Sequence, residues 1–262
     1  KYRSQFMDGT FKTNTNIFNG KNYSVPAHMA TRKMLYNKDL MKKVGLDPAK
    51  PPKTLAELKD YASKITKAGE GKIYGVSYAF GASAGVYHAV IAPGTTSFGL
   101  VNGYDYTKQQ FDFSVYKPIL EVLKSLFDEK IVFPGSPTLK AEQELALFSA
   151  GNIGFMFTPS SAAGLLNTAD YKCNFEVGVA DIPTYLDKPA YKNRMDFGPG
   201  YVMSATSKVK KEAYEFMEWL SSSEEATGSL QKAGRDFYPV KTVNGNEKYA
   251  AATQVGKLLA PT

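Results

Sequence analysis

The sequence predicts an α/β fold with two lobes. Short runs rich in β-branched and aromatic residues alternate with helix-length amphipathic segments, which is typical of α/β proteins rather than all-α or all-β ones. The chain has 262 residues and a mass of 28.7 kDa, a size that fits two lobes or one large α/β unit. Apolar residues make up 43% and charged residues 22%, so disorder and coiled coils are excluded.

Four amphipathic segments predict helices. In the first, Thr54–Lys67, Thr54 and Glu57 form a capping box, and the apolar positions of the segment form one buried stripe. The other three helices are expected at Tyr116–Lys130, Ala141–Ala150 and Val209–Leu220. The last of these is expected to bury Val209, Ala213, Phe216, Met217 and Leu220.

Strands are expected between the helices. The β-rich runs are Ile73–Phe80, Ile153–Phe157, Phe175–Val179 and Tyr201–Ser204. The Pro-rich and Tyr-rich stretch Ile182–Pro189 reads as a connector. Tyr23–Asn37 is a long extended segment, which suits a crossing between two lobes.

The charge balance does not indicate a nucleic-acid protein. Lysine and arginine number 32 against 25 aspartates and glutamates, a net charge of +7. The densest basic cluster, Lys208–Lys211, opens a predicted helix and is interpreted as a solvated helix face. No apolar run approaches the roughly 18 residues of a membrane helix. The 17 tyrosines and 16 phenylalanines suit a cleft that stacks on sugars or other flat ligands.

One motif suggests catalysis, but its partners do not support it. Gly81–Gly85 matches the G-x-S-x-G nucleophile elbow around Ser83 and follows a predicted strand. The mechanism needs an acid and then a histidine later in the chain, whereas His28 lies upstream and His88 follows only five residues after Ser83. We therefore interpret the motif as a small-residue turn at the mouth of a cleft, and expect no catalytic residue.

Metal and cofactor sites are also not expected. Two histidines and the single Cys173 do not make a zinc site without several carboxylates, and neither phosphate-binding glycine motif is present. The carboxylate pairs Glu142/Glu144 and Glu224/Glu225 lie near the N-termini of predicted helices, where negative charge favours the helix dipole. A glycosidase built on two carboxylates stays open, because their separation is not visible in a sequence.

Three groups of segments, in this order and spacing, resemble one protein family over residues 15–245. The first group is Gly20–Pro26, Leu35–Leu40, Val44–Pro48 and Pro51–Leu58. The second is the helix–strand junction Phe148–Met156, and the third is the strand Gly200–Ser204 followed by Lys210–Leu220 and Ser221–Glu225. Together they are similar to the family 1 extracellular solute-binding proteins of ABC importers, which include the maltose-binding protein.

The resemblance implies a type II periplasmic-binding-protein fold, in which two α/β lobes are joined by a hinge and the ligand lies in the cleft. It implies that residues 1–32 are a remnant of lobe 1 with the first hinge crossing, residues 33–190 are lobe 2, and residues 191–262 return to lobe 1. The family has further residues before and after the matched region. The resemblance therefore implies an incomplete fold. Either the missing parts are disordered or cleaved, or self-association completes the missing lobe.

The implied function is capture of a sugar or small oligosaccharide outside the cytoplasm, in the periplasm or on a lipid anchor, for delivery to the ABC permease. Ser160 stands where maltodextrin binders carry a stacking tryptophan. Tyr23–Pro26 and Thr158–Leu165 are similar to the glycerol-3-phosphate-binding branch, so a polyol phosphate is the alternative ligand. A glycan-active enzyme is the alternative of another class.

The family pattern also implies where ligand contacts come from. They are expected after the hinge proline, after the strand Ile73–Phe80, at the end of the strand Ile153–Phe157, on the returning strand and in the loop 234–239. The residues at these places are His28, Met29, Arg32, Ser83, Tyr87, Ser160, Ser161, Gly200, Tyr201, Arg235, Asp236 and Tyr238. Each also has a purely structural interpretation, such as core packing for Tyr87 or a helix cap for Ser160 and Ser161.

Overall fold

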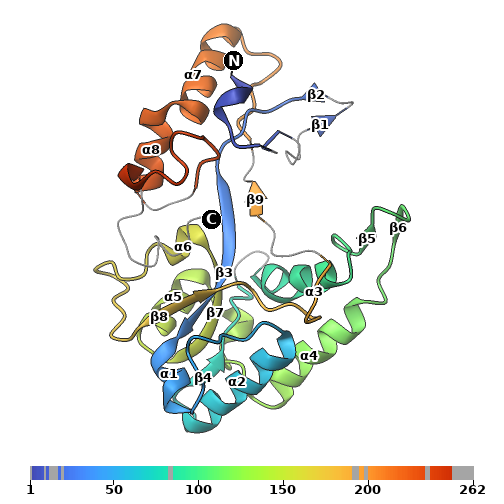
Figure 1. Ribbon diagram of the computed structural model, residues 1–262, viewed down its shortest axis with the longest axis vertical. Coiled ribbons are helices and arrows are strands. Elements are labelled where there is room, and N and C mark those ends of the chain that lie inside the picture. Colours follow the sequence, from blue (N-terminus) through green and yellow to red (C-terminus); the bar gives the residue numbers. More distant parts are fainter. Residues whose placement is uncertain are drawn as a thin grey trace. The chain divides into compact units, whose positions relative to one another are not determined.

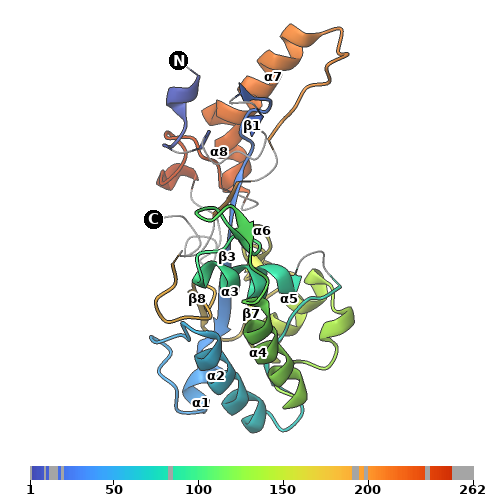
Figure 2. The same ribbon diagram turned by 90° about the vertical axis from the view of Figure 1, so that its right-hand side faces the viewer.

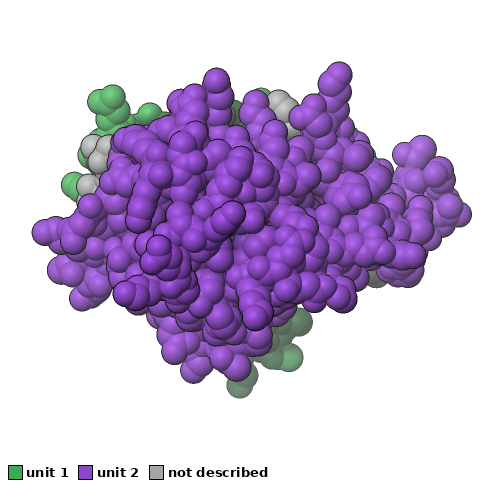
Figure 3. All heavy atoms as spheres, turned by 90° about the horizontal axis from the view of Figure 1, so that it is seen from below, with its two compact units in different colours: residues 1–31, 195–262 green, residues 32–194 purple. Residues whose placement is uncertain are grey.

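A computed structural model describes residues 2–8, 10–11, 17–18, 21–81, 85–190, 195–197, 200–233 and 237–249. The chain forms two compact units, coloured separately in Figure 3: unit 1 is residues 1–31 and 195–262, and unit 2 is residues 32–194. Each unit contains both helices and strands, which confirms the predicted α/β class. Strand β3 (Met29–Asn37) contributes residues to both units.

The sheet of unit 2 has the strand order β4-β7-β3-β8. Its other strands are β4 (Tyr74–Val76), β7 (Ile153–Pro159) and β8 (Val177–Ala180). β4 runs parallel to β7, whereas β3 is antiparallel to both β7 and β8. β4, β7 and β8 therefore run in one direction, and β3, which lies between β7 and β8, runs in the opposite direction. The carboxyl ends of β4, β7 and β8 thus lie at the same edge as Arg32, the first residue of β3 in unit 2.

Helices cover both faces of this sheet (Figures 1 and 2). On one face lie α2 (Leu55–Ala68) and α4 (Tyr116–Asp128), and on the other lie α5 (Ala141–Ser149) and the short α6 (Ser160–Ala163). The remaining helical elements of unit 2 are α1 (Lys38–Lys43), the π-helix η2 (Tyr87–Ile91), α3 (Ala92–Ser97) and the 3-10 helix η3 (Ser136–Thr138).

Helix α2 forms as its sequence predicts. The Thr54 hydroxyl accepts from the Glu57 N–H, and the Glu57 carboxylate accepts from the Thr54 N–H, so the capping box is confirmed. The apolar stripe Leu55, Leu58, Ala62 and Ile65 is buried against the sheet. Helices α4 and α5 match their predicted ranges to within two residues, and Gly151 follows α5 with a φ of 81°, the left-handed conformation that favours glycine.

A two-stranded hairpin of β5 (Tyr104–Asp105) and β6 (Gln110–Phe111) extends from unit 2. Its aromatic rings form a series of contacts. The ring centroid of Tyr104 lies 4.9 Å from that of Tyr106 and 5.0 Å from that of Phe111, and Phe111 stacks on Phe113 with 5.4 Å between ring centroids. Such a short hairpin is marginal alone, so these ring contacts hold the two strands together.

Unit 1 combines small strands with two helices. Its described strands are β1 (Ile17–Phe18), β2 (Lys21–Asn22), the first part of β3 and β9 (Met195–Phe197), which pairs antiparallel with β3. Its two α-helices are α7 (Lys210–Ser222) and α8 (Glu224–Lys232), and it also contains the 3-10 helices η1 (Arg3–Gln5) and η4 (Glu247–Tyr249). A small core is formed by Phe6, Tyr238, Val240, Val243 and Tyr249.

The burial predicted for helix α7 is partly wrong. Val209 and Phe216, both expected inside, are 58% and 59% exposed, and Trp219 stacks on Phe216 at the surface. The helix instead buries its last residues, Ser221 and Ser222. An amphipathic pattern identifies an apolar face but not whether another element covers that face.

Several strand predictions need correction. Tyr201–Ser204 is not a strand, because only Tyr201 pairs, in an isolated bridge with Val25. The expected strand Ile73–Phe80 is shortened to β4, since Tyr78 and Phe80 bond to Ser136 beyond the strand end. Strand β9, which the sequence analysis missed, is three residues long and is fixed by its pairing with β3.

Cys173 lies half-buried in unit 2 and forms no disulfide. Burial raises the pKa of its thiol to about 11. Among the described residues, no helix has the length and apolar character needed to cross a membrane.

Candidate functional site

The edge where β4, β7 and β8 end is the candidate binding edge of unit 2. In open α/β sheets, ligands bind outside the carboxyl ends of the strands, at the place where neighbouring connections diverge. At this edge Arg32 lies directly across from Pro159 in the β3–β7 pairing, and Ser160 follows Pro159. The structure therefore brings Arg32 and Ser160 together, although they are 128 positions apart in the sequence.

The position of Ser160 is fixed by the start of helix α6. Ser160 is buried and is the first residue of that helix, and its carbonyl accepts from the Gly164 N–H at 2.9 Å. Pro159 occupies the N-cap, and no side chain caps the helix, so Ser160 does not act as an N-cap. Ser161 is the second residue of α6, and its side chain lies outside the described residues.

The segment after β4 leads to the same edge. Ser83 belongs to residues 82–84, which lie outside the described part of the chain. Tyr87 opens the π-helix η2 and is half-buried; its hydroxyl donates to the Asn102 side-chain oxygen, and its ring meets the His88 ring edge-on at 5.0 Å. Tyr87 is therefore a surface-layer residue with a fixed hydroxyl rather than part of the core.

The other described candidates belong to unit 1. Met29 is buried, and its backbone exchanges two hydrogen bonds with Phe237, at 2.7 and 3.1 Å. Tyr238 is also buried, in the small core of that unit, and its N–H donates to Gln231. His28 is half-buried next to Met29. Arg235 and Asp236 lie outside the described residues.

Gly200 and Tyr201 are held against the segment before β3. The backbones of Tyr201 and Val25 exchange two hydrogen bonds, at 2.9 and 3.0 Å. A Cβ atom on residue 200 would lie 2.6 Å from the Ser24 side chain and from the Val25 carbonyl oxygen, so only glycine permits this approach. Burial raises the pKa of the Tyr201 hydroxyl.

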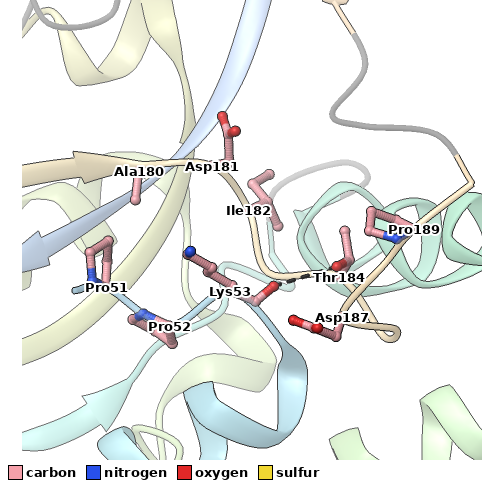
Figure 4. A pocket seen from close by; sticks show the side chains of 9 residues that line it. All are labelled: Pro51, Pro52, Lys53, Ala180, Asp181, Ile182, Thr184, Asp187 and Pro189. Atoms are coloured by element: carbon pink, nitrogen blue, oxygen red, sulfur yellow. Dashed lines mark hydrogen bonds between the residues drawn. The ribbon is translucent and has the colours of Figure 1, made fainter.

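A pocket of about 310 Å³ opens beside the carboxyl end of β8 (Figure 4). Its walls come from Pro51–Lys53 and from the connector after β8. The Lys53 side chain runs into the pocket and the Asp187 carboxylate points toward it, whereas Asp181 points away and pairs with Lys33 at 2.6 Å. Neither Lys53 nor Asp187 forms an ion pair with another described residue. The lining residues are Pro51, Pro52, Lys53, Ala180, Asp181, Ile182, Thr184, Asp187 and Pro189.

Sequence reasoning missed this pocket. It treated residues 182–189 as a plain connector, yet Thr184 is anchored to the start of α2: its carbonyl accepts from the Leu55 N–H at 2.8 Å and its N–H donates to the Lys53 carbonyl at 3.0 Å. The sequence feature that pointed to this pocket is the pair of proline-containing stretches, Pro51–Pro52 and Ile182–Pro189. Proline makes both stretches rigid, and two rigid segments that lie side by side leave a fixed gap between them.

Unit 1 contains a second pocket, of about 420 Å³, which includes aromatic residues from distant parts of the chain. Tyr2, Phe11, Tyr23 and Tyr214 contribute to its lining, together with Arg3. The Tyr2 hydroxyl hydrogen-bonds with Ser221 at 2.7 Å, and burial raises its pKa to about 12. Within the described residues, no group of three or more histidine, cysteine or acidic side chains is placed to hold a metal ion.

Comparison with known proteins gives consistent matches. Residues 2–227 match the family model described as bacterial extracellular solute-binding protein. A binding protein of Brucella abortus is 26% identical over 256 residues, 95% of this chain and 57% of its own length. The sn-glycerol-3-phosphate-binding periplasmic protein UgpB of Salmonella typhimurium is 29% identical over 248 residues, 91% of this chain and 53% of its own length. This chain thus spans little more than half of these relatives.

A solved structure extends the likeness to the fold. The maltose-bound structure of T. maritima MalE3 superposes with a TM-score of 0.78 at 24% identity. The superposition covers 98% of this chain and 64% of that protein. At 24% identity this similarity shows a shared fold.

Proposed function

Because the chain belongs to the family of bacterial extracellular solute-binding proteins, we propose that it is the solute-binding component of an ABC importer and captures a sugar or small oligosaccharide. The family membership also agrees with the predicted type II periplasmic-binding-protein fold, which its structural relatives share. The place of action is then outside the cytoplasm, and the partner is the membrane permease that receives the solute.

The observation that carries this proposal is the pairing of Arg32 with the β7–α6 turn. Half-buried Arg32 lies opposite Pro159 in the β3–β7 pairing, directly before the first turn of α6 and at the carboxyl end of the sheet. Sugar hydroxyls are recognised by such convergent donors and acceptors at one side of a largely apolar site. The loop after β4 and Tyr87 supply further groups in this proposal, and Ser83 and Ser161 belong to the same set.

For unit 1 we propose that His28, Met29, Gly200, Tyr201, Arg235, Asp236 and Tyr238 also contact the solute. The proposed hinge crossings are Tyr23–Asn37, which contains β3 with its residues in both units, and the segment around residues 191–198. Ligand binding then shifts an equilibrium between open and closed states by its higher affinity for the closed one, and no catalytic group is needed.

Two observations bear on the ligand class. MalE3 was solved with maltose, and Ser160 offers no aromatic surface at the end of β7, so a short neutral sugar is the main candidate. The likeness to UgpB favours the alternative, a polyol phosphate such as sn-glycerol-3-phosphate. Arg32 distinguishes the two ligands, because a guanidinium forms a bidentate pair with an anionic phosphate, whereas a sugar hydroxyl is a neutral acceptor that it binds more weakly.

Isothermal titration calorimetry of the full chain tests the proposal, with maltose, maltotriose, mannitol and sn-glycerol-3-phosphate as probes. We expect binding of at least one neutral sugar and a loss of about 10- to 100-fold for Arg32→Ala, the size of a hydrogen bond to a charged group. Lys33→Ala is the matched control, since that neighbouring side chain alternates to the other side of β3 and pairs with Asp181.

Two other outcomes are informative. Tight binding of glycerol phosphate alone, lost in Arg32→Ala, supports the alternative ligand, whereas no heat with any probe contradicts the solute-binding proposal for this chain. Release of smaller sugars from maltotriose on prolonged incubation, abolished by Asp236→Asn, supports the glycan-active enzyme instead. Size-exclusion chromatography with light scattering tests the predicted self-association.

A further inference from the structure

Glu144 is a buried acid directly beneath the candidate binding edge. It was expected to favour the helix dipole near the start of α5, but its side chain turns inward and is only 3% exposed. One carboxylate oxygen accepts from the Ser77 hydroxyl at 2.7 Å, and Ser77 is itself completely buried. Burying an ionised carboxylate costs much more free energy than one hydrogen bond contributes, so the burial of Glu144 requires an explanation.

Ser77 is the first residue after β4, and the segment it opens is fixed to its surroundings by four amides. The N–H of Ser77 donates to the Phe155 carbonyl at 3.2 Å, and that of Tyr78 to the Ser136 hydroxyl at 3.2 Å. The N–H of Phe80 donates to the Ser136 carbonyl at 3.2 Å and that of Gly81 to the Leu139 carbonyl at 2.8 Å. This segment, residues 77–81, directly precedes Ser83 in the sequence and lies shortly before Tyr87, which opens η2.

We propose that Glu144 is a positioning residue for the binding edge: its protonated form holds segment 77–81 against α5, and its ionised form releases that segment to water. The proposal rests on the proposed function only where it concerns ligand affinity. Glu144 itself does not touch the ligand in this scheme and acts through Ser77.

The direction of the effect follows from the surroundings of the carboxyl group. Burial raises the pKa of Glu144 to about 7, and the Ser77 hydrogen bond counteracts part of that shift. The two elements that α5 packs against most closely, β7 and α6, contain no acidic or basic side chain, and Tyr78 is the titratable neighbour that senses the Glu144 charge. On α5 itself, Glu142 is exposed, and Lys140 precedes the helix.

When segment 77–81 is released, the carboxyl group of Glu144 becomes hydrated and its pKa returns to that of an ordinary glutamate. Release is therefore favoured as pH rises, and the linkage between the two pKa values makes the opening equilibrium about tenfold larger at pH 8 than at pH 6. The four amides of segment 77–81 exchange with solvent only when the segment opens, so they report this equilibrium directly.

Hydrogen exchange of the ligand-free full chain at pH 6 and pH 8 tests the inference, after correction for the pH dependence of intrinsic exchange. We expect about a tenfold rise in opening for the amides of Ser77, Tyr78, Phe80 and Gly81 in the wild type, and no rise in Glu144→Gln. Glu142→Gln, an exposed acid of the same helix, is the matched control and should behave as the wild type. An equal rise in wild type and Glu144→Gln overturns the proposal.

Ser77→Ala provides a second, independent variant. Removing the hydroxyl that stabilises the ionised form raises the pKa of Glu144 further, so the rise in opening should move to higher pH. An unchanged midpoint contradicts the proposed link between the two side chains, even if Glu144→Gln does not fold.

A second arm measures the affinity for whichever probe binds in the calorimetric panel, at pH 6, 7 and 8. We expect weaker binding at pH 8 in the wild type and a flat profile in Glu144→Gln. A pH-independent affinity together with the expected exchange result would show that segment 77–81 moves without serving the site. If no probe binds, the exchange arm still decides the positioning role.

Discussion

Tyr36 covers Gly178 across the β3–β8 pairing. The two residues are direct partners in the antiparallel register, and a Cβ atom on residue 178 would lie 2.1 Å from the Tyr36 ring. The Tyr36 hydroxyl donates to the Pro48 carbonyl at 2.9 Å, which fixes the ring in place. The Tyr36 ring thus packs directly on Gly178 and adds a side-chain contact to the backbone pairing of β3 with the edge strand β8.

We predict that Gly178→Ala destabilises the protein by about 1–3 kcal/mol, the usual effect of overpacking a closed site. Urea unfolding measures the change. The double variant Gly178→Ala with Tyr36→Ala should cost less than the sum of the single variants, because the clash is gone once the ring is removed. Additive costs would mean that the ring does not restrict residue 178.

The capping box of α2 gives a second prediction. Thr54→Ala removes the acceptor of the Glu57 N–H and should lower the free energy of unfolding by about 1 kcal/mol. Thr54→Ser keeps the hydroxyl and should lose much less. If the two variants unfold alike in urea, the hydroxyl does not cap the helix.

The exposed face of α7 gives a third prediction. Because Phe216 lies mostly in solvent, Phe216→Ala should change the free energy of unfolding by less than about 1 kcal/mol. Phe148→Ala, at a completely buried position of α5, should cost about 3–5 kcal/mol. A large loss at position 216 would show that another surface covers this face in solution.

Glu144 gives a fourth prediction, for global stability. Its pKa is about 7 in the folded protein against 4.5 as an ordinary glutamate, so the folded state holds the proton more tightly. The contribution of this group is therefore fully present below pH 4.5, declines as pH rises and is lost above about pH 7, a change of about 3 kcal/mol. Glu144→Gln should flatten this part of the stability profile in urea unfolding at pH 5 to 8, and a profile parallel to the wild type would contradict it.

A surface ion pair supplies a contrasting fifth prediction. Lys33 and Asp181 lie 2.6 Å apart, but the Asp181 side chain is 67% exposed. Exposed pairs contribute only about 0–1 kcal/mol, so Lys33→Ala should leave the unfolding midpoint nearly unchanged. This supports the use of that variant as the binding control. A loss comparable to that of Phe148→Ala would disqualify it.

Local signals in the sequence were sufficient for much of unit 2. The capping box of Thr54 and Glu57 fixed the start of α2, and Gly151 marked the end of α5, because each depends on residues within a few positions. The antiparallel crossing of β3, by contrast, depends on pairing with β7 and β8, more than a hundred residues away. No local pattern specifies such partners.

The candidate site divides in the same way. Arg32 and Ser160 were identified by family resemblance, and the register that places them together comes from the sheet. The pocket around Lys53 and Asp187 was missed, because it is formed by connectors without periodicity. Glu144 was misplaced for a related reason: an acid near a helix N-terminus usually faces water, and only the tertiary packing of α5 turns it inward.

The single half-buried thiol has a practical consequence for following motion in this protein. With a pKa of about 11, only about one Cys173 side chain in ten thousand is ionised at pH 7, compared with a few per cent for an ordinary thiol. A cysteine introduced at an exposed position such as Val209 should thus react with a maleimide dye long before Cys173 does. Site-specific fluorescent reporters can be attached to the otherwise native chain.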